Sequence, residues 1–173
     1  SSVSSNKPTT DLARLGYTMK LPKAYVDFTY YGRGPIDNFN DRKVGQNIEI
    51  FRQKVGDEII HCRPQSMGNH EEVRWAALTD AKGQGAVFIA DGIMSASALP
   101  WSEMMITEVG HPYQLPQSDG VYLHLDAKVT GLGGNSCGQG APLLPDRAKA
   151  EIRNFGFIIR PLADAKNLQE TVK

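Results

Sequence analysis

Cysteine is scarce in this sequence: Cys62 and Cys137 are the only two among 173 residues. At most one disulfide can form, so a disulfide framework is excluded as the main source of stability. Two free buried thiols are the favoured interpretation, because free cysteine packs as a small apolar residue. A single bridge between them stays open as the alternative.

Long apolar runs and an excess of either charge are also absent. No run approaches the roughly 20 apolar residues that a helix needs to cross a bilayer. Lys+Arg and Asp+Glu both number 19, whereas neutralising many phosphates or holding an anionic membrane surface takes an excess of Lys and Arg. We therefore expect neither nucleic acid nor a membrane as a partner.

What the sequence does contain fits a globular domain, because 40% of its residues are hydrophobic and 22% are charged. Its length allows one domain of ordinary size or one piece of a larger protein. The N-terminal stretch "SSVSSNKPTT" is polar, rich in serine and without the apolar core of a secretory signal. We assign residues 1–11 to a flexible tail or linker and residues 12–173 to one domain.

Strict alternation in "VYLHLDAKV", residues Val121–Val129, predicts a half-buried β-strand. Its polar face carries Tyr122, His124, Asp126 and Lys128, which suits a sugar site but more often faces solvent or another domain. Five further aromatic or β-branched runs predict strands: Tyr25–Tyr31, Asn47–Phe51, Arg74–Asp80, Ala86–Ala90 and Phe155–Arg160. Six or more strands joined by short turns predict an all-β fold, an antiparallel β-sandwich.

One stretch, "PWSEMMITEVG", predicts a short helix instead. Ser102 is a suitable N-cap, Glu103 suits the first turn, and Gly110 is a stop signal. A strand remains the alternative, because Ile106 and Val109 suit either structure.

Histidine and cysteine patterns give little support for metal or nucleophile chemistry. The histidines at positions 61, 70, 111 and 124 form no HxxxH or HxH pair, and "HCRP" would need two further metal ligands that no spacing supplies. Cys137 in "GGNSCGQG" is the candidate nucleophile, but the sequence has no GxSxG elbow and no identifiable histidine base for it. The same run lacks the GK[ST] ending of a phosphate loop. We predict no metal, no cofactor and no catalytic residue in this chain.

Six stretches, in order, carry a resemblance to a known family. The most specific is "YYGRGPIDNFNDRK", residues Tyr30–Lys43, which resembles the aromatic-Y-G-R-G-P-x-E-N-Y-x-D-R signature of the C-terminal small-chain domain (domain 5) of glycoside hydrolase family 2 β-galactosidases. The other five are "LARLGYTMKLP", "PQSMGNHEEVRW", "HPYQLP", "VYLHLDAKVTGLGGNSCG" and "FGFIIRP". Together they cover nearly the whole chain from Leu12 to Pro161.

The resemblance implies a β-sandwich of the galactose mutarotase-like supersandwich type, of which this chain is the C-terminal half to two-thirds. In the family, the catalytic glutamates lie on a TIM barrel, which needs about 250 residues and cannot fit in this chain. The resemblance therefore implies an accessory domain that completes the architecture and one wall of the sugar site of a retaining β-glycosidase. The barrel and a galactoside-like carbohydrate are its implied partners, and the chain alone is predicted to be inactive.

The resemblance also implies where substrate is bound. In some relatives, the turn after the strand Val121–Val129 carries a tryptophan that stacks on galactose, and by order of residues this position is Cys137. The residues expected to bind substrate are Gly134, Asn135, Ser136 and Cys137 in this turn, with His124 from the polar face of the strand.

The signature itself is predicted to be structural, as a rigid corner at a strand end. Gly32 and Gly34 would adopt backbone angles closed to other residues, and Pro35 would fix the following turn. Arg33 would pair with a nearby carboxylate, Asp37 or Asp41. The predicted structural residues are Gly32, Arg33, Gly34, Pro35, Asp37, Asp41 and Arg42.

Two alternatives stay open. A free-standing carbohydrate-binding module of mutarotase-like fold would need an exposed aromatic platform, for which the candidates are Trp75, Trp101, Tyr113 and Tyr122. An independent mutarotase-like enzyme would need a histidine and a carboxylate in one cleft, for which the candidates are His111, His124 and Asp126.

Overall fold

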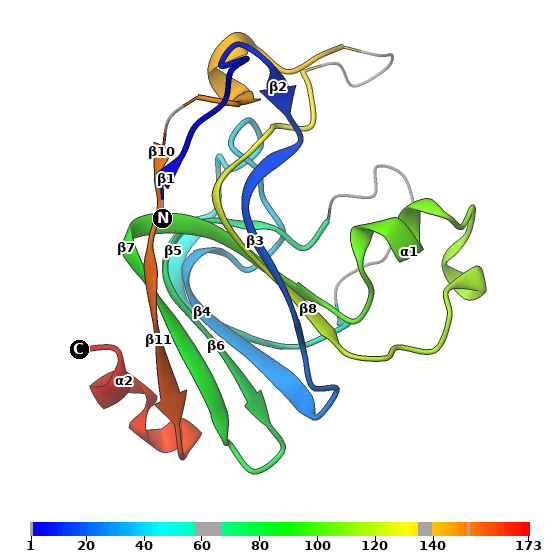
Figure 1. The fold of residues 1–173 in the computed structure, drawn as a ribbon. Helices are drawn as coiled ribbons and strands as arrows, with labels where there is room; N and C mark the ends of the chain where they lie inside the picture. Colours follow the sequence, from blue (N-terminus) through cyan, green and yellow to red (C-terminus); the bar gives the residue numbers. More distant parts are fainter. Residues whose placement is uncertain (1, 58–66, 135–139, 152) are drawn as a thin grey trace.

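Antiparallel strands dominate the protein in this computed structural model, which describes residues 2–57, 67–134, 140–151 and 153–173 (Figure 1). Seven of the strands form one sheet in the order β3-β8-β7-β6-β4-β5, with β11 paired to β7 beside that path. Their bounds are β3 (Arg14–Leu21), β4 (Tyr25–Gly34), β5 (Asn47–Lys54), β6 (His70–Asp80), β7 (Gly85–Leu99), β8 (Val121–Val129) and β11 (Phe157–Leu162). Among the described residues, the two α-helices are α1 (Glu103–Thr107) and α2 (Leu168–Thr171), and the 3-10 turns are η1 (Pro112–Gln114), η2 (Leu144–Asp146) and η3 (Ala165–Asn167).

The long strand β7 makes this sheet branch and curl. Its first part, from Gly85 to Ala90, pairs with β11, and its last part, from Ser95 to Leu99, pairs with β8. β6 pairs with both parts. In Figure 1, β3 and β8 cross in front of β4 and β6, so the arms of the sheet form two facing layers. The predicted all-β fold, an antiparallel sandwich, is confirmed.

The main core lies between these layers, where apolar side chains alternate along the strands. Phe28 and Tyr30 of β4 are fully buried there with Leu123 and Leu125 of β8. Fully burying one such side chain contributes roughly 1.5–3 kcal/mol, so this cluster stabilises the contact between the layers. Its other buried members are Val73, Ala76, Leu78, Phe88, Met94, Ala96, Ala98 and Val121.

Two smaller clusters cover other parts of the sheet. Trp75 and Val87 pack with Leu162 of β11 and with Leu168 of α2, so the C-terminal helix shields the outer face of β6 and β7. The other cluster consists of Met67, Leu99 and Ile106 of α1.

Helix α1 begins where the sequence predicts it. The Ser102 hydroxyl accepts a hydrogen bond from the Met105 N–H at 3.2 Å, and Ile106 is fully buried. The helix ends at Thr107, before the expected stop at Gly110, and the strand alternative for this stretch is wrong. Within the described ranges, no helix has the length and apolar character required to span a membrane.

The six predicted strands are all present, and β8 has the predicted bounds. β3 was not predicted, because this half-exposed edge strand has little alternation of burial along "RLGYTMKL". The stretch assigned to a tail, residues 1–11, contains β1 (Ser2–Val3) and the first residue of β2 (Asp11–Leu12). Their antiparallel partners are β10 (Arg153–Asn154) and β9 (Ala148–Lys149), respectively.

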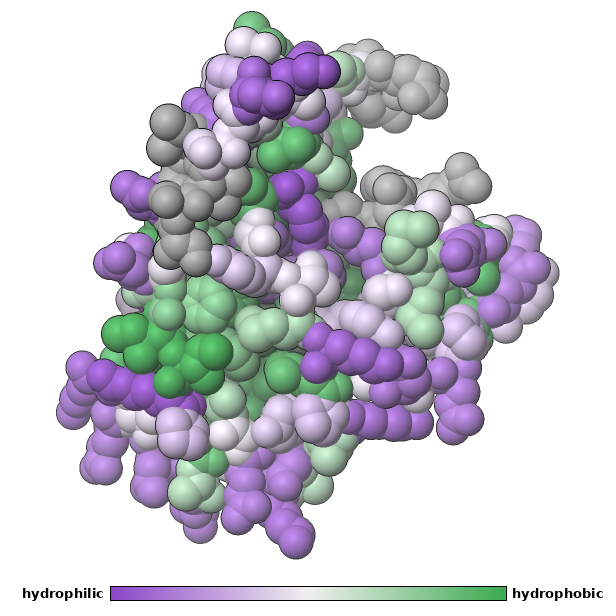
Figure 2. Space-filling view, in the orientation of Figure 1, coloured by the Kyte–Doolittle hydropathy of each residue, from purple (hydrophilic) through white to green (hydrophobic). Residues whose placement is uncertain are grey.

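Strand β11 exposes apolar side chains at the surface. Ile158 and Ile159 are 57% and 55% exposed, and Figure 2 shows a hydrophobic area over this strand. Contiguous exposed apolar surface commonly marks a place where another protein part packs.

The two glycines of the signature lie within β4, and the prediction about their backbone angles is wrong. Neither adopts a positive φ, and both pair with β5 as ordinary strand residues. They are needed for space: a Cβ on Gly32 would lie 2.6 Å from Val73 Cγ2, and one on Gly34 would lie 2.4 Å from the Tyr30 hydroxyl. The turn begins at Pro35, after a cis peptide bond.

We expect Gly32→Ala to destabilise the protein by about 1–3 kcal/mol, because an added methyl group in a packed interior forces its neighbours apart. Urea unfolding measures the change. Gly134→Ala is the matched control, since nothing lies within 4 Å of a Cβ there, and it should change stability by less than about 0.5 kcal/mol. Equal stability of the two variants would contradict the packing explanation.

Candidate functional site

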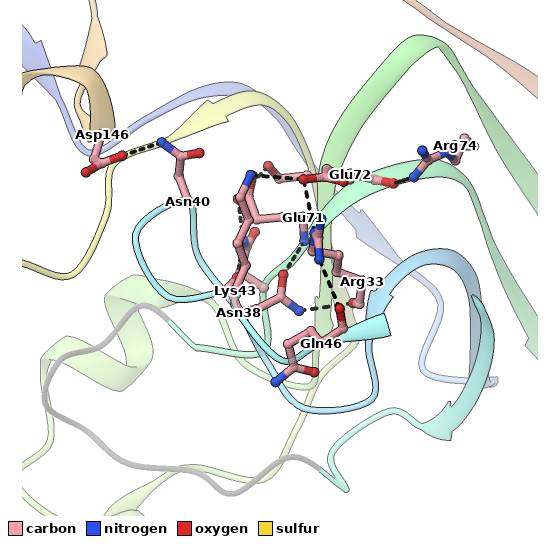
Figure 3. A network of polar contacts seen from close by, with 11 residues as sticks. Arg33, Asn38, Asn40, Lys43, Gln46, Glu71, Glu72, Arg74 and Asp146 are labelled. Atoms are coloured by element: carbon pink, nitrogen blue, oxygen red, sulfur yellow. Dashed lines mark hydrogen bonds and ion pairs between the residues drawn. The ribbon is translucent and has the colours of Figure 1, made fainter. Parts of the chain in front are cut away.

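The signature continues after β4 into a loop, residues 35–46, which we call the signature loop. Its buried Asn38 makes several of the loop's hydrogen bonds with the rest of the domain (Figure 3). The Asn38 amide donates to the carbonyls of Arg33 and Ile36, both at 3.0 Å, and its oxygen accepts from the Glu71 N–H at 2.9 Å. Asn38 and Asn69 are joined twice more, by the Asn38 N–H to the Asn69 carbonyl at 2.6 Å and by the Asn69 amide to the Asn38 carbonyl at 2.8 Å. The signature loop is therefore fixed to the start of β6.

The start of β6 contains a β-bulge that directs Glu72 towards the signature. His70 pairs with Ala96 and Val73 with Met94, so β6 has one residue more than β7 over this interval. Glu72 has a φ of 55°, in the left-handed region that a residue with a side chain adopts at a cost of roughly 1–3 kcal/mol. Its carboxylate lies 3.0 Å from Arg33 Nε and 3.0 Å from Lys43 Nζ. Hydrogen bonding from Arg33, followed by that from Lys43, lowers the pKa of Glu72.

Arg33 thus has a different partner from the predicted one. It pairs with Glu72 rather than with Asp37 or Asp41, and its guanidinium also donates to the Gln46 carbonyl at 2.9 Å. The reason is that β4 pairs with β6, so the bulge of β6 is nearer to Arg33 than the carboxylates further along its own loop. Asp37 instead pairs with Arg42 at 2.9 Å.

Asp41 links the signature loop to the turn that follows β8. This turn, residues Gly131–Gly134, is called the glycine turn below. The Asp41 carboxylate accepts hydrogen bonds from the N–H groups of Leu132 at 3.1 Å and Gly133 at 2.9 Å. Beside it, the Asn40 amide donates to the Asp146 carboxylate at 2.7 Å, and the Gly131 N–H donates to the Asp146 carbonyl at 2.9 Å. The family signature and the glycine-rich run are therefore parts of one site.

A second set of polar groups lies on β6, β7 and β8, and all but Glu71 are buried. We call this set the polar layer: Glu71, Ser95, Ser97, His124 and Asp126. Ser95 pairs with Asp126 and Ser97 with His124 in the sheet, so these four face the same side. The Ser95 hydroxyl donates to the Glu71 carboxylate at 2.9 Å. Arg14 forms ion pairs with both this layer and α1, because its guanidinium lies 3.3 Å from Asp126 and 2.8 Å from Glu103.

Burial dominates the acidity of the polar layer. It raises the pKa of Asp126 to about 7, against the opposing effect of Arg14. Desolvation, helped by Arg14, lowers the pKa of His124 to about 3, and the His124 Nδ1 lies 3.0 Å from the Thr18 hydroxyl. Burial also raises the pKa of Glu71. At neutral pH, His124 is therefore uncharged and packed inside the domain.

Two of the predicted substrate-binding residues, Gly134 and His124, are among the described residues, and these two do not share one surface. Gly134 is exposed at the end of the glycine turn, whereas His124 is only 4% exposed. The polar face of β8 was expected to suit a sugar site or to face solvent or another domain. His124 and Asp126 are instead buried within this domain, where Arg14 lies between Asp126 and Glu103 of α1. Asn135, Ser136 and Cys137 lie outside the described residues, as does Cys62.

The other candidates are also dispersed. His111 is exposed at the N-cap of η1 and stacks on Tyr113 with ring centroids 5.3 Å apart, whereas His124 and Asp126 are buried. Trp75 is buried in the cluster that it forms with Val87, Leu162 and Leu168. Over the described ranges, no three His, Cys, Asp or Glu side chains are grouped so that they could hold a metal ion.

Five residues that shape the site were missed from sequence: Arg14, Asn38, Asn69, Glu71 and Glu72. All five lie inside the quoted family stretches, where their residue types were visible but their partners were not. The adjacent pair Glu71 and Glu72 was the available signal, since two neighbouring carboxylates in a strand normally point to opposite faces.

These features define a class of protein: an all-β domain whose polar loops are fixed against one another at one end of a curled sheet. Residues 2–159 match the family described as the beta-galactosidase small chain, and the chain belongs to this family.

Curated relatives include three bacterial beta-galactosidases. That of Priestia megaterium (strain DSM 319 / IMG 1521) is 31% identical over 88% of this chain, and that of Staphylococcus xylosus is 34% identical over 84% of it. The relative from Lactobacillus delbrueckii subsp. bulgaricus is 34% identical over 87% of this chain. The chain spans only 14–15% of the length of these relatives, so it corresponds to a small part of each.

We expect Arg33→Ala to lower the free energy of unfolding by roughly 1.5–3 kcal/mol, because it removes charge-assisted hydrogen bonds from a half-buried site. Arg42→Ala is the matched control. Its side chain is 55% exposed in the pair with Asp37, and such surface pairs contribute about 0–1 kcal/mol. Chemical denaturation of both variants tests this difference, and a larger loss for Arg42→Ala would contradict the assignment of Glu72 as the partner of Arg33.

The polar layer predicts opposing pH effects between pH 3.8 and 6.5. There, folded Asp126 keeps a proton that the unfolded chain has released, so its contribution to stability falls as pH rises. Folded His124 lacks a proton that the unfolded chain holds, so its contribution rises with pH. Relative to wild type, Asp126→Asn should gain stability with rising pH and His124→Gln should lose it, each by up to about 1.4 kcal/mol per pH unit.

Thermal and urea unfolding across this pH range measure both slopes. His111→Gln, at an exposed histidine, is the control and should follow the wild-type profile. Parallel profiles for all four proteins would show that neither buried group is linked to folding in this way.

Proposed function

We propose that this chain is the accessory domain of a β-galactosidase-like glycoside hydrolase of family 2. In this role it completes the architecture and one wall of the sugar site of a retaining β-glycosidase. The observation that carries the proposal is the contact of Asp41 with the glycine turn. Through it, the most specific family signature holds the segment that leads into the residues expected to bind substrate. A wall of a binding site is useful only if its backbone is fixed.

The proposal assigns hydrolysis to another part of the enzyme. Retaining hydrolysis takes two carboxyl groups about 5–5.5 Å apart that face the scissile bond. Glu71 and Asp126 are instead engaged with Ser95 and Arg14 inside the polar layer. We therefore place the catalytic carboxylates on a TIM barrel outside this chain, and the much greater length of the relatives leaves room for it.

The exposed apolar side chains of β11 support an accessory role. Ile158 and Ile159 offer surface that would be covered if the domain packed against a larger neighbour. The mutarotase-like supersandwich is the architecture that we propose for the complete domain.

One observation favours a second candidate, a free-standing carbohydrate-binding module of mutarotase-like fold. Tyr113 is 83% exposed and its ring is held by stacking on His111. A fixed, exposed aromatic ring is the platform that sugar recognition by such a module needs. Among the other aromatic candidates, Trp101 donates to the Pro116 carbonyl and Tyr122 donates to Asp119.

We expect the isolated chain neither to hydrolyse a nitrophenyl galactoside nor to bind galactose or lactose at millimolar concentration, as followed by NMR titration. The Staphylococcus xylosus enzyme without the matched segment should be inactive and should regain hydrolysis when this chain is fused in its place. An unrelated β-sandwich of similar size is the control for the fusion.

Two results would contradict the accessory role. One is a folded fusion without activity. The other is millimolar binding of galactose by the isolated chain that Tyr113→Ala abolishes, which would support the carbohydrate-binding module instead.

A further inference from the structure

We infer that Asp41 is a positioning residue for the sugar site, which it serves by holding the backbone of the glycine turn. The inference rests on the proposed function, because it concerns the same wall. It adds that the affinity for galactoside depends on one carboxylate of the signature loop, which itself touches no sugar.

The first argument is the geometry of the contact. The N–H groups of Leu132 and Gly133 are consecutive, and each donates to a different oxygen of Asp41. Gly133 has a φ of 105°, and consecutive N–H groups in such a turn form a concavity that binds anions. A carboxylate offers two acceptor atoms and no donor, so aspartate satisfies both groups at once.

The second argument is steric. A Cβ on Gly131 would lie 2.3 Å from Asp41 Oδ2, and a Cβ on Gly133 would lie 2.3 Å from the Gly140 carbonyl oxygen. The turn therefore lies in close contact both with Asp41 and with the backbone at Gly140. Glycine at position 131 is required because Asp41 occupies the space that a side chain would need.

The third argument is that the contact is local, while its support is rigid. Asp41 is exposed, so its loss removes no core packing. The loop that carries it is fixed by Asn38 to Asn69 and Glu71, and the neighbouring Asn40 holds Asp146. Removing the Asp41 carboxylate should therefore release the glycine turn and leave the rest of the domain unchanged.

Amide hydrogen exchange tests the contact in the isolated chain. In Asp41→Ala, the Leu132 and Gly133 amides should exchange about fivefold faster or more, as expected when a hydrogen bond with a typical net contribution is lost. Asp41→Asn should have an intermediate effect, because its amide keeps one acceptor oxygen. Asp37→Asn is the matched control, since it alters a carboxylate of the same loop that pairs with Arg42, and it should leave both amides unchanged.

The fusion enzyme described above tests the consequence. Asp41→Ala should raise KM for nitrophenyl galactoside about fivefold or more, with a smaller change in kcat and an unchanged Tm. Asp37→Asn should leave KM unchanged. A double-mutant cycle gives an independent readout: Gly131→Ala should raise KM in the wild-type background and should cost less in the Asp41→Ala background, where the added methyl group has room.

The outcomes distinguish a failure of the inference about Asp41 from a failure of the proposed function. Unchanged exchange at Leu132 and Gly133 in Asp41→Ala would overturn the inference, and so would faster exchange with an unchanged KM. An inactive wild-type fusion would instead contradict the proposed function, while the exchange experiment would still decide whether Asp41 holds the turn.

Discussion

The arrangement of the site depends on the buried amide of Asn38. Its side chain and backbone connect the end of β4, the signature loop and the start of β6. A buried amide that satisfies its donors and acceptors in this way has few alternative positions, because any shift leaves polar groups unpaired in a dry interior. This anchor fixes the backbone around it, and the fixed backbone positions Arg33, Lys43 and Asp41. The ion pairs around Glu72 then stabilise a backbone conformation that aspartate, asparagine or glycine would adopt more easily.

The polar layer shows how the sheet accommodates charge away from solvent. Asp126 and His124 occupy neighbouring outward positions on β8, and burial shifts the pKa of each towards its uncharged form. A strand whose alternation looks like a simple inside and outside pattern therefore has both faces covered. Arg14 is the residue that makes this possible, because it joins β3, β8 and α1 through Asp126 and Glu103.

Much of the fold could be predicted from sequence because alternation and turn residues are local signals. β8 and the cap of α1 at Ser102 are the clearest cases, and β3 was missed because an edge strand alternates weakly. The site was harder, since its contacts join distant positions. Asp41 and Gly133 are 92 residues apart, and no spacing rule relates them. Arg33 was assigned to nearby carboxylates, yet strand pairing places it beside Glu72. The family resemblance located the right stretches but not their partners.

The extra residue in β6 also changes the phase of that strand. Residues three apart in a regular strand face opposite sides, yet His70 and Val73 are both fully buried, with His70 stacked on Tyr30 at 4.0 Å and Val73 in the main core. The bulge accommodates the extra residue, so that His70 and Val73 both point into the core although they are three residues apart. A deletion of one residue here would place His70 and Val73 two apart, on the same face of a regular strand. Their inward directions would survive, but the strand would lose the bulge in which the left-handed backbone of Glu72 directs its carboxylate to Arg33 and Lys43. The extra residue in the "NHEEV" stretch therefore serves the ion pairs of the site and is not needed to bury His70 and Val73.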